Sequence, residues 1–372
     1  MAQRQLTIVQ MVPELNCGGV EQVTVELASE IARLGHRSIV LSAGGQLAEE
    51  LQRSGVEHFT WPIRAKSPWT LRVIWPLRKF LQKASVDIVH AHSRIPAWVA
   101  DLTLRTLPSR SRPSFITTAH GLYRPNLFSR VMTRGERVIA ISETVQKYLE
   151  DSYKDLPPNR VRTIPLGIDT EQFSRDFLPS PDWLKKWQRT YPQLNGCPVI
   201  TLIGRMVRLK GHADLIEIVE QVRETVPNIK ALIVGGEDPR RRQYARQIHE
   251  EVRERRLEQH VIFTGQRNDI REIYSISDVV VGLTSNPPEA FGRTTIEALS
   301  MGVPVVGYAH GGTGEILERV FPEGLVRVGD WTTAARMISK FIQFPPVVPT
   351  EHFYLKSHML AETVSLYEEL AA

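Results

Sequence analysis

The feature that most constrains the fold is a regular alternation of short apolar runs with longer amphipathic segments. In the first half of the chain, segments typical of helices lie at 19–34, 69–84, 95–107 and 143–152. Runs typical of strands separate them, at 6–12, 38–42, 87–90, 115–118, 138–141 and 161–164. Strands that alternate with helices of this length predict an α/β fold with a parallel sheet covered on both faces.

The alternation stops at residues 167–196, where prolines and large aromatic residues gather, and then starts again. The second half predicts strands at 199–203, 230–234, 261–264 and 279–281, and helices at 213–224, 241–255 and 269–275. A chain of 372 residues is long enough for two domains. We therefore expect domains at 1–170 and 197–353, connected by 171–196.

Composition narrows the class of protein. A hydrophobic content of 42% and a charged content of 23% are ordinary for a globular protein, and no apolar run reaches the ~18 residues of a membrane span. No signal peptide is expected at the N-terminus. The cysteines, Cys17 and Cys197, lie in different halves and outside any Cys/His cluster. This argues against a disulfide scaffold or a zinc site and fits a cytoplasmic location.

The charge is uneven: the net charge is +7 over residues 1–175 and −2 over the remainder. A basic first half suits an acidic partner or an anionic membrane surface, although ordinary surface solubility explains it as well. The segment 69–84 combines tryptophans with arginines and lysines, and is either an interfacial helix at the inner face of the membrane or an ordinary covering helix. The basic and aromatic residues form no nucleic-acid-binding module.

Residues 285–312 carry the most informative pattern. Asn286-Pro287-Pro288 predicts a loop, residues 293–300 a helix that ends at Gly302, and residues 303–306 a buried strand. Glu289 and Glu297 stand on either side of the helix start, at most roughly 12 Å apart along a helix. The carboxylates could bind hydroxyls at both ends of a nucleotide diphospho-sugar, with the diphosphate at the helix amides. A bare pair of glutamates would instead cap the helix and face solvent.

The flanking residues favour the first interpretation. Glu-Ala-Phe-Gly, the glutamate eight residues on, Ala-Leu and Gly-Val-Pro-Val-Val resemble the signature of the retaining glycosyltransferases of family 4, also called group 1. The resemblance implies the GT-B fold, with two doubly wound Rossmann-like domains facing across a cleft. The N-terminal domain would bind the acceptor and be joined by the C-terminal helix 354–372, and the C-terminal domain would bind the donor. The form E-A-F-G-R-T-T-I-E-A looks most like enzymes of bacterial lipopolysaccharide or exopolysaccharide biosynthesis.

The resemblance implies a role for each matching residue of the second half. Glu289 would bind the donor sugar and Glu297 the ribose, while Arg205 and Lys210 would stabilise the leaving diphosphate. Without the resemblance, Arg205 and Lys210 could be plain surface cations. The loop from His310 to Glu315 would close over the donor, and Glu315 would begin a helix. The other implied donor-binding residues are Ala290, Phe291, Gly292, Arg293 and, beside the nucleobase, Arg267.

In the first half, Gly18-Gly19 precedes a predicted helix and matches the family's glycine loop against donor phosphate and acceptor. Alone it would be an ordinary turn. His120 would orient the donor beside its sugar, and His92 would lie near the acceptor, although a strand-end histidine is often structural. The zinc alternative, with His90 and His92 as ligands, lacks a third ligand.

The expected reaction is transfer of a sugar from a nucleoside diphospho-sugar to a hydroxyl of a glycan or glycolipid. A UDP-sugar is the favoured donor, with GDP- or ADP-sugar as alternatives. No Asp-x-Asp motif occurs, so we expect no metal and no cofactor. Two other functions stay open: hydrolysis or epimerisation of a nucleotide sugar on the same fold, and a non-catalytic basic protein associated with membranes.

Overall fold

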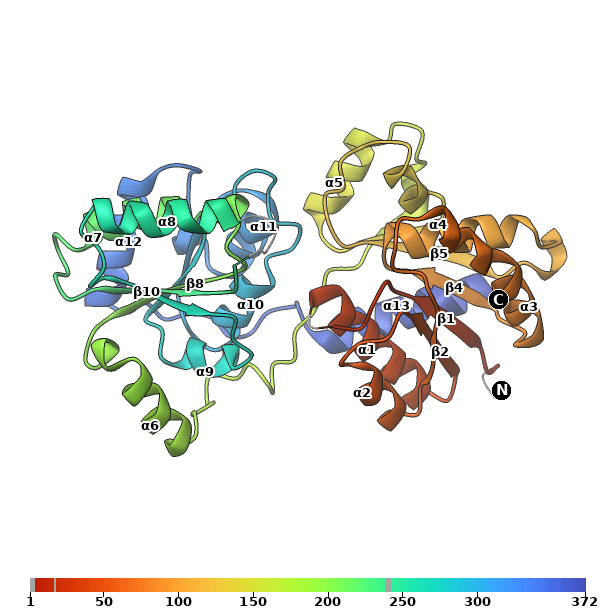
Figure 1. The fold of residues 1–372 in the computed structure, drawn as a ribbon, viewed down its shortest axis with the longest axis horizontal. Helices are drawn as coiled ribbons and strands as arrows, with labels where there is room; N and C mark the ends of the chain where they lie inside the picture. Colours follow the sequence, from red (N-terminus) through yellow and green to blue (C-terminus); the bar gives the residue numbers. More distant parts are fainter. Residues whose placement is uncertain (1–3, 17, 238–241) are drawn as a thin grey trace. The chain divides into compact units, whose positions relative to one another are not determined.

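The computed structural model describes residues 4–16, 18–237 and 242–372, and Figure 1 shows its fold. The chain divides into two compact units. The first comprises Met1–Pro165 and Ser357–Ala372, and the second comprises Leu166–Lys356. Residues 171–196, expected to connect two domains, therefore lie inside the second unit. The reason is that Trp187 and Leu194 are buried there, in a core cluster that also contains Leu232.

The first unit is built on a parallel sheet with the strand order β3-β2-β1-β4-β5-β6-β7. Its strands are β1 (Thr7–Met11), β2 (Arg37–Ser42), β3 (Glu57–Thr60), β4 (Ile88–Ala91), β5 (Ser114–Ala119), β6 (Arg137–Ala140) and β7 (Val161–Thr163). The α-helices are α1 (Gly19–Arg33), α2 (Ala48–Arg53), α3 (Ile74–Lys83), α4 (Arg94–Arg105) and α5 (Glu143–Ser152). Short 3₁₀ turns are η1 (Pro68–Val73), η2 (Ser109–Ser111), η3 (Ser129–Thr133) and η4 (Pro158–Arg160).

The sheet is covered on both faces, as the apolar runs predict. One core cluster joins strand residues such as Val9 and Val89 to Leu77 of α3 and Leu104 of α4. A separate cluster joins Val40 to α1 and α2. The helix α13 (Lys356–Ala371), blue in Figure 1, lies among the red and orange elements of this unit.

Two features of the first unit differ from the sequence prediction. The strand β3 and the preceding helix α2 were not predicted, because β3 is a half-exposed edge strand that carries no apolar run. The segment 69–84 is not one helix, since η1 comes first and α3 begins at Ile74. Pro76 lies in the first turn of α3, where the backbone N–H that proline lacks has no partner within the helix.

The second unit contains another parallel sheet, with the order β10-β9-β8-β11-β12-β13. Its strands are β8 (Val199–Ile203), β9 (Lys230–Val234), β10 (Val261–Gly265), β11 (Val279–Gly282), β12 (Val305–Tyr308) and β13 (Leu325–Val326). Its helices are α6 (Pro181–Thr190), α7 (His212–Val222), α8 (Arg242–Glu254), α9 (Ile270–Ser275), α10 (Arg293–Ser300), α11 (Gly311–Val320) and α12 (Trp331–Gln343). The turns are η5 (Pro192–Leu194), η6 (Arg208–Lys210) and η7 (Pro322–Gly324).

Most predicted elements of the second half occur within two residues of their predicted ends. Arg241, the predicted start of one helix, lies outside the described residues. The strand predicted at 303–306 begins two residues later, at Val305, after Pro304. The helix predicted to begin at Glu315 begins at Gly311. Within the described residues, no helix is long and apolar enough to cross a membrane.

Candidate functional site

The centre of the candidate site in the second unit is an ion pair between Lys210 and Glu289. The Lys210 Nζ donates to Glu289 Oε2 at 2.5 Å, and the Thr284 hydroxyl donates to the same oxygen at 3.0 Å. Both charged side chains remain partly exposed, at 24% and 28%. The two residues that the family resemblance assigns to phosphate and sugar therefore lie together, and solvent reaches both.

Two glycines let Lys210 take this position. The side chain of Lys210 lies against Gly204, where an added Cβ would come within 3.1 Å of Lys210 Cδ. Gly211 follows at φ +75°, and a Cβ there would lie 2.4 Å from the carbonyl oxygen of Leu283. Glycine is thus required at 211 both by conformation and by space.

The backbone of Glu289 is fixed by the H-G-G-T loop. The N–H of Gly312 donates to the carbonyl of Glu289 at 2.7 Å. A Cβ on Gly312 would lie 2.2 Å from the carbonyl oxygen of Phe291, and one on Gly311, at φ +61°, 2.6 Å from that of Glu289. The loop predicted to close over the donor therefore forms the start of α11 and packs against Glu-Ala-Phe-Gly.

The helix α10 begins directly after this turn. Its N-cap, Gly292, has φ +93°, and no side chain caps the first turn. The first amides of a helix carry partial positive charge and suit an anion such as a phosphate. Phe291 is buried, and its ring packs edge to face with that of Tyr354, with 5.6 Å between the two ring centres. Phe291 can therefore offer a ligand only its backbone.

Glu297 is buried inside α10, and its side chain is 9% exposed. The Arg293 Nε donates to Glu297 Oε1 at 2.7 Å, and the hydroxyl of the fully buried Tyr274 donates to Oε2 at 3.0 Å. Burial raises the pKa of Glu297, while Arg293 and Tyr274 act in the opposite direction. Each carboxylate oxygen of Glu297 thus already accepts one hydrogen bond from the protein, out of about four lone-pair positions on the group.

The two other arginines assigned to the donor have different surroundings. Arg205 is exposed, and its side chain has no hydrogen-bond or ion-pair partner among the described residues. Arg267 instead donates from Nε to Asp269 Oδ1 at 2.8 Å, and its guanidinium carbon lies 5.4 Å from the Trp187 ring. Arg267 is therefore held in a local network, whereas Arg205 is available to a ligand.

In the first unit, three histidines meet at the carboxyl ends of β4 and β5. His92 Nδ1 lies 3.1 Å from His120 Nε2, and the ring centres of His90 and His92 are 4.1 Å apart. Burial lowers the pKa of His90 to about 3, that of His120 to about 4, and that of His92 well below its usual 6.5. Repulsion between the neighbouring histidines adds to the effect of burial on the pKa values of His90 and His92, and all three shifts favour neutral rings at pH 7.

The position of the proton on His120 follows from the orientation of the Gln10 amide, through His92. The side-chain amide of the fully buried Gln10 donates to the Thr24 carbonyl, and its Oε1 lies 2.8 Å from His92 Nε2. With the Gln10 amide in this orientation, its Nε2 3.5 Å from the Thr24 carbonyl, His92 donates from Nε2, which leaves Nδ1 as an acceptor for the Nε2–H of His120. The Nδ1 of His120 is consequently unprotonated and can accept a hydrogen bond from a hydroxyl.

His90 belongs to the same group but has a structural role. Its Nδ1 lies 2.6 Å from the hydroxyl of Tyr367, in α13, and its Nε2 lies 2.6 Å from the Thr118 hydroxyl. The zinc alternative for His90 and His92 gains no support, because the described residues contain no group of three or more His, Cys, Asp or Glu side chains that could hold a metal.

The glycine loop leads into α1. Gly18 is the N-cap residue in extended conformation, and no side chain caps the helix. A Cβ on Gly18 would lie 2.2 Å from Glu21 Oε2, whereas a Cβ on Gly19 would meet nothing within 4 Å. Gly19 therefore borders open space where a ligand could approach the backbone. Cys17 lies outside the described residues.

Sequence reasoning missed four side chains of these networks. Gln10 had a signal, because a glutamine interrupts the apolar run of β1. Thr284 also had one, as a polar residue just after β11. Tyr274 and Tyr367 had none, since their partners lie 23 and 277 residues away.

Comparison with known proteins gives the family. Residues 17–172 match the family described as Glycosyltransferase Family 4, and residues 185–350 match Glycosyl transferases group 1. N-acetyl-alpha-D-glucosaminyl L-malate synthase of Bacillus anthracis is 24% identical over 334 residues, which cover 86% of this chain and 83% of the enzyme.

Solved structures agree with this assignment. A glycosyltransferase from Rickettsia africae has a TM-score of 0.85 and 27% identity and covers 99% of both chains. Anabaena Alr3699/HepE in complex with UDP-glucose has a TM-score of 0.77 and 19% identity and covers 99% of this chain and 98% of its own. The two Rossmann-like units are those of the GT-B fold, and the chain belongs to the family 4, group 1 glycosyltransferases.

Proposed function

We propose that this glycosyltransferase is a retaining, metal-independent enzyme that moves a sugar from a nucleoside diphospho-sugar to a hydroxyl of a glycan or glycolipid. The anomeric carbon–oxygen bond to the diphosphate breaks, and a new one forms to the acceptor oxygen on the same face of the sugar. The acceptor's proton passes to the leaving phosphate. This role of the leaving group and the retained configuration rest on the resemblance to the family.

The observation that carries the proposal is the Lys210–Glu289 pair beside the uncapped start of α10. A cation, two exposed carboxylate lone pairs and a helix N-terminus supply what a diphosphate and a sugar need. Arg205 adds a second accessible cation from the loop that follows β8. These cations and amides would stabilise the charge on the leaving diphosphate without a metal.

We also propose which donor the enzyme uses and which pathway it serves. A UDP-sugar is favoured, and the Anabaena complex with UDP-glucose, which shares the fold, supports that choice. Lipopolysaccharide or exopolysaccharide assembly is favoured by the form of the signature around Glu289 and Glu297. His120, through its unprotonated Nδ1, would accept a hydroxyl of the donor sugar or the acceptor.

Calorimetric titration with UDP tests the proposal. Lys210→Ala should weaken UDP binding about tenfold or more, because a charge-assisted hydrogen bond contributes ~1.5–3 kcal/mol. Arg208→Ala is the matched control, because Arg208 lies in the same 3₁₀ turn but bonds Gln247 Oε1 at 3.1 Å. Equal affinity of wild type and Lys210→Ala would remove Lys210 from the donor site.

Two further measurements separate the alternatives. Rapid consumption of a UDP-sugar without any acceptor would favour a hydrolase or epimerase. Addition of EDTA should leave transfer unchanged; activity lost to EDTA and restored by magnesium would contradict the metal-independent mechanism.

A further inference from the structure

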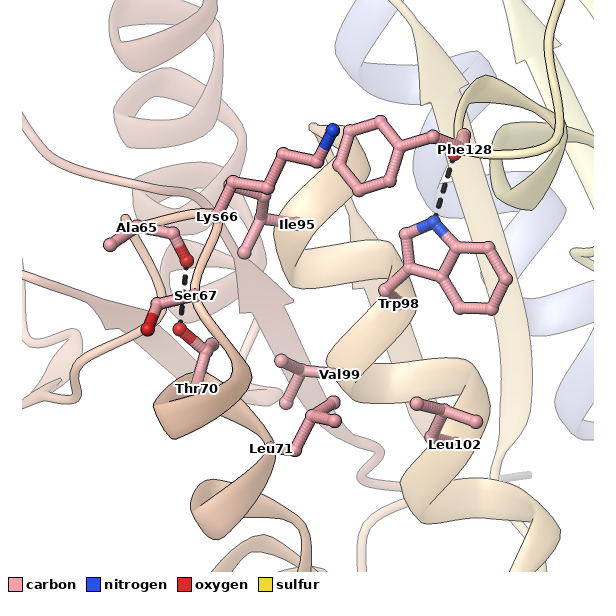
Figure 2. A pocket seen from close by; sticks show the side chains of 10 residues that line it. All are labelled: Ala65, Lys66, Ser67, Thr70, Leu71, Ile95, Trp98, Val99, Leu102 and Phe128. Carbon is pink, nitrogen blue, oxygen red and sulfur yellow. Dashed lines mark hydrogen bonds between the residues drawn. The ribbon is translucent and has the colours of Figure 1, made fainter.

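The first unit contains an apolar pocket that the proposed donor site does not use. Figure 2 shows it between the segment 65–71 and helix α4, with a volume of about 420 Å³. This volume lies within the ~300–1,000 Å³ range of small-molecule sites. Its apolar wall is formed by Leu71, Ile95, Trp98, Val99, Leu102 and Phe128.

Contacts on two sides hold the Trp98 side chain in the wall of the pocket. The Trp98 indole donates to the carbonyl of Phe128 at 2.9 Å, and the Arg134 guanidinium carbon lies 4.6 Å from the centre of the Trp98 ring. On the opposite side, the Thr70 hydroxyl donates to the carbonyl of Ala65 at 2.7 Å, as Figure 2 shows. Because Trp98 is held at both its nitrogen and its ring face, it cannot turn to fill the space.

Positive charge lies at one end of this pocket. A neighbouring hollow shares Lys66 and Phe128 with it and adds Arg94. The Lys66 Nζ is 4.4 Å from the centre of the Phe128 ring, and the Arg94 guanidinium carbon is 5.5 Å from it. Within the described part of the chain, neither cation has a carboxylate partner. A molecule with an apolar chain that ends in a phosphate would suit both hollows: the chain would fill the apolar pocket, and the phosphate would lie beside Lys66 and Arg94.

Large apolar side chains are exposed around the same elements. Leu71, which lines the pocket, is 47% exposed, and Leu127, which lines the basic hollow, is 80% exposed. Trp69 in η1 is 65% exposed, with the Arg72 guanidinium 3.6 Å from its ring centre. Exposed tryptophan and arginine side chains are typical of surfaces that rest at a lipid–water boundary.

The hollow that contains Arg94 lies near the histidines His92 and His120. Arg94 begins α4 two residues after His92, and its guanidinium carbon lies 4.9 Å from the ring of Tyr123, which follows His120 by three residues. We propose that the acceptor is a lipid-phosphate-linked glycan, whose lipid chain occupies the Trp98 pocket, whose phosphate binds Lys66 and Arg94, and whose sugar carries the hydroxyl that receives the transferred sugar. This inference rests on the proposed function, since it names the class of acceptor that the transferase uses.

Calorimetry with dodecyl phosphate, below the concentration at which it forms micelles, tests the site without any need for transfer. Wild type should bind dodecyl phosphate at least about tenfold more tightly than dodecanol, and inorganic phosphate should not compete at similar concentration. Leu102→Trp should abolish binding by filling the pocket, whereas Leu178→Trp, at a residue 84% exposed in the second unit, should leave it unchanged.

A charge reversal keeps the test decisive if Leu102→Trp fails to fold. Lys66→Glu should lower dodecyl phosphate affinity about tenfold or more, and Lys79→Glu, on α3 and outside both hollows, should not. Equal losses in the two variants, or equal binding of dodecanol, would overturn the proposed phosphate site. UDP titration of the same samples separates the cases: UDP binding without dodecyl phosphate binding refutes only the lipid site, and loss of both refutes the proposed function too.

Discussion

Lys210 and Glu289 are 79 residues apart in the chain, yet the ammonium of one donates directly to the carboxylate of the other. The cation proposed to hold the diphosphate is therefore paired with the carboxylate proposed to hold the sugar. A ligand that brings its own phosphate has to compete with Glu289 for Lys210.

This competition predicts opposite effects of Glu289→Gln on binding and on transfer. UDP without a sugar should bind as tightly as in wild type or up to about fivefold more tightly, because a partly exposed ion pair contributes ~0.2–1 kcal/mol. Sugar transfer should fall at least about tenfold, because the amide is a weaker acceptor for hydroxyls. Calorimetry and a transfer assay on the same preparation measure the two effects, and a loss of UDP affinity would contradict the competition.

The packing of Gly311 against Glu289 predicts that Gly311→Ala will damage both stability and the donor site. An added methyl would lie 2.6 Å from the Glu289 carbonyl oxygen, on a backbone at φ +61°. The control is Gly196→Ala, at φ +69° with nothing within 4 Å, which carries only the conformational strain. Gly196→Ala should cost roughly 1 kcal/mol of unfolding free energy.

Gly311→Ala should cost about 2 kcal/mol or more, and weaken UDP binding as well, because the clash adds to the strain. Thermal unfolding and UDP titration of both variants measure the difference. Equal destabilisation in the two variants would mean that the loop can move away from Glu289 at little cost.

Much of the fold could be predicted because parallel sheets bury their strands on both faces. Runs such as 199–203 and 230–234 are mostly apolar, with four apolar residues of five in each, and both occur as strands with the predicted bounds. The edge strand β3 could not be found this way, since half of Glu57–Thr60 faces solvent. The helix α6 was missed because the prolines in and around it, Pro179, Pro181 and Pro192, indicated a linker, although Pro181 occupies the first position of a helix, where proline is favoured.

Some residues of the candidate site could be assigned from the sequence, and others could not. Lys210, Glu289 and His120 were assigned through the family resemblance, and their roles stay predictions; each lies after a strand, at the edge of a parallel sheet where ligands bind. Their partners could not all be found in this way. Gln10 and Tyr367 act from within a strand and a distant helix, and only the folded chain shows that they reach His92 and His90.

The hydrogen-bond chain from Gln10 through His92 predicts that Gln10→Glu will impair transfer without affecting UDP binding. A carboxylate next to His92 would favour its protonated form. Protonated His92 would donate from Nδ1, so His120 would have to accept at Nε2 and carry its own proton on Nδ1. The nitrogen proposed to accept a substrate hydroxyl would then be blocked.

The expected loss of kcat is about tenfold or more near neutral pH, the scale of one lost acceptor. Nitrogen chemical shifts of His120 report the tautomer directly and should exchange between Nδ1 and Nε2. Gln10→Asn, which keeps an uncharged amide, is the conservative control and should retain the wild-type tautomer. A wild-type tautomer in Gln10→Glu together with reduced transfer would assign Gln10 a purely structural role.

The buried histidines predict that the free energy of unfolding falls as the pH is lowered from 7 toward 4.5. Burial lowers the pKa of His90 from 6.5 to about 3 in the folded state. Between those two values the unfolded chain binds more protons, so stability rises with pH and this contribution is complete above the unfolded pKa. His90→Gln should reduce the slope by up to about 1.4 kcal/mol per pH unit.

The control for this slope is Thr118→Val, which removes the hydroxyl 2.6 Å from His90 Nε2 but keeps the histidine. It should lower stability at pH 7 and leave the slope unchanged. Carboxyl groups such as Glu297, whose pKa burial raises, contribute with the opposite sign, but equally in wild type and both variants. The difference between the urea-unfolding curves of wild type and His90→Gln across pH 4.5–7 therefore reports His90 together with its effect on His92, and identical slopes would show that the His90 ring binds protons equally in the folded and unfolded chain.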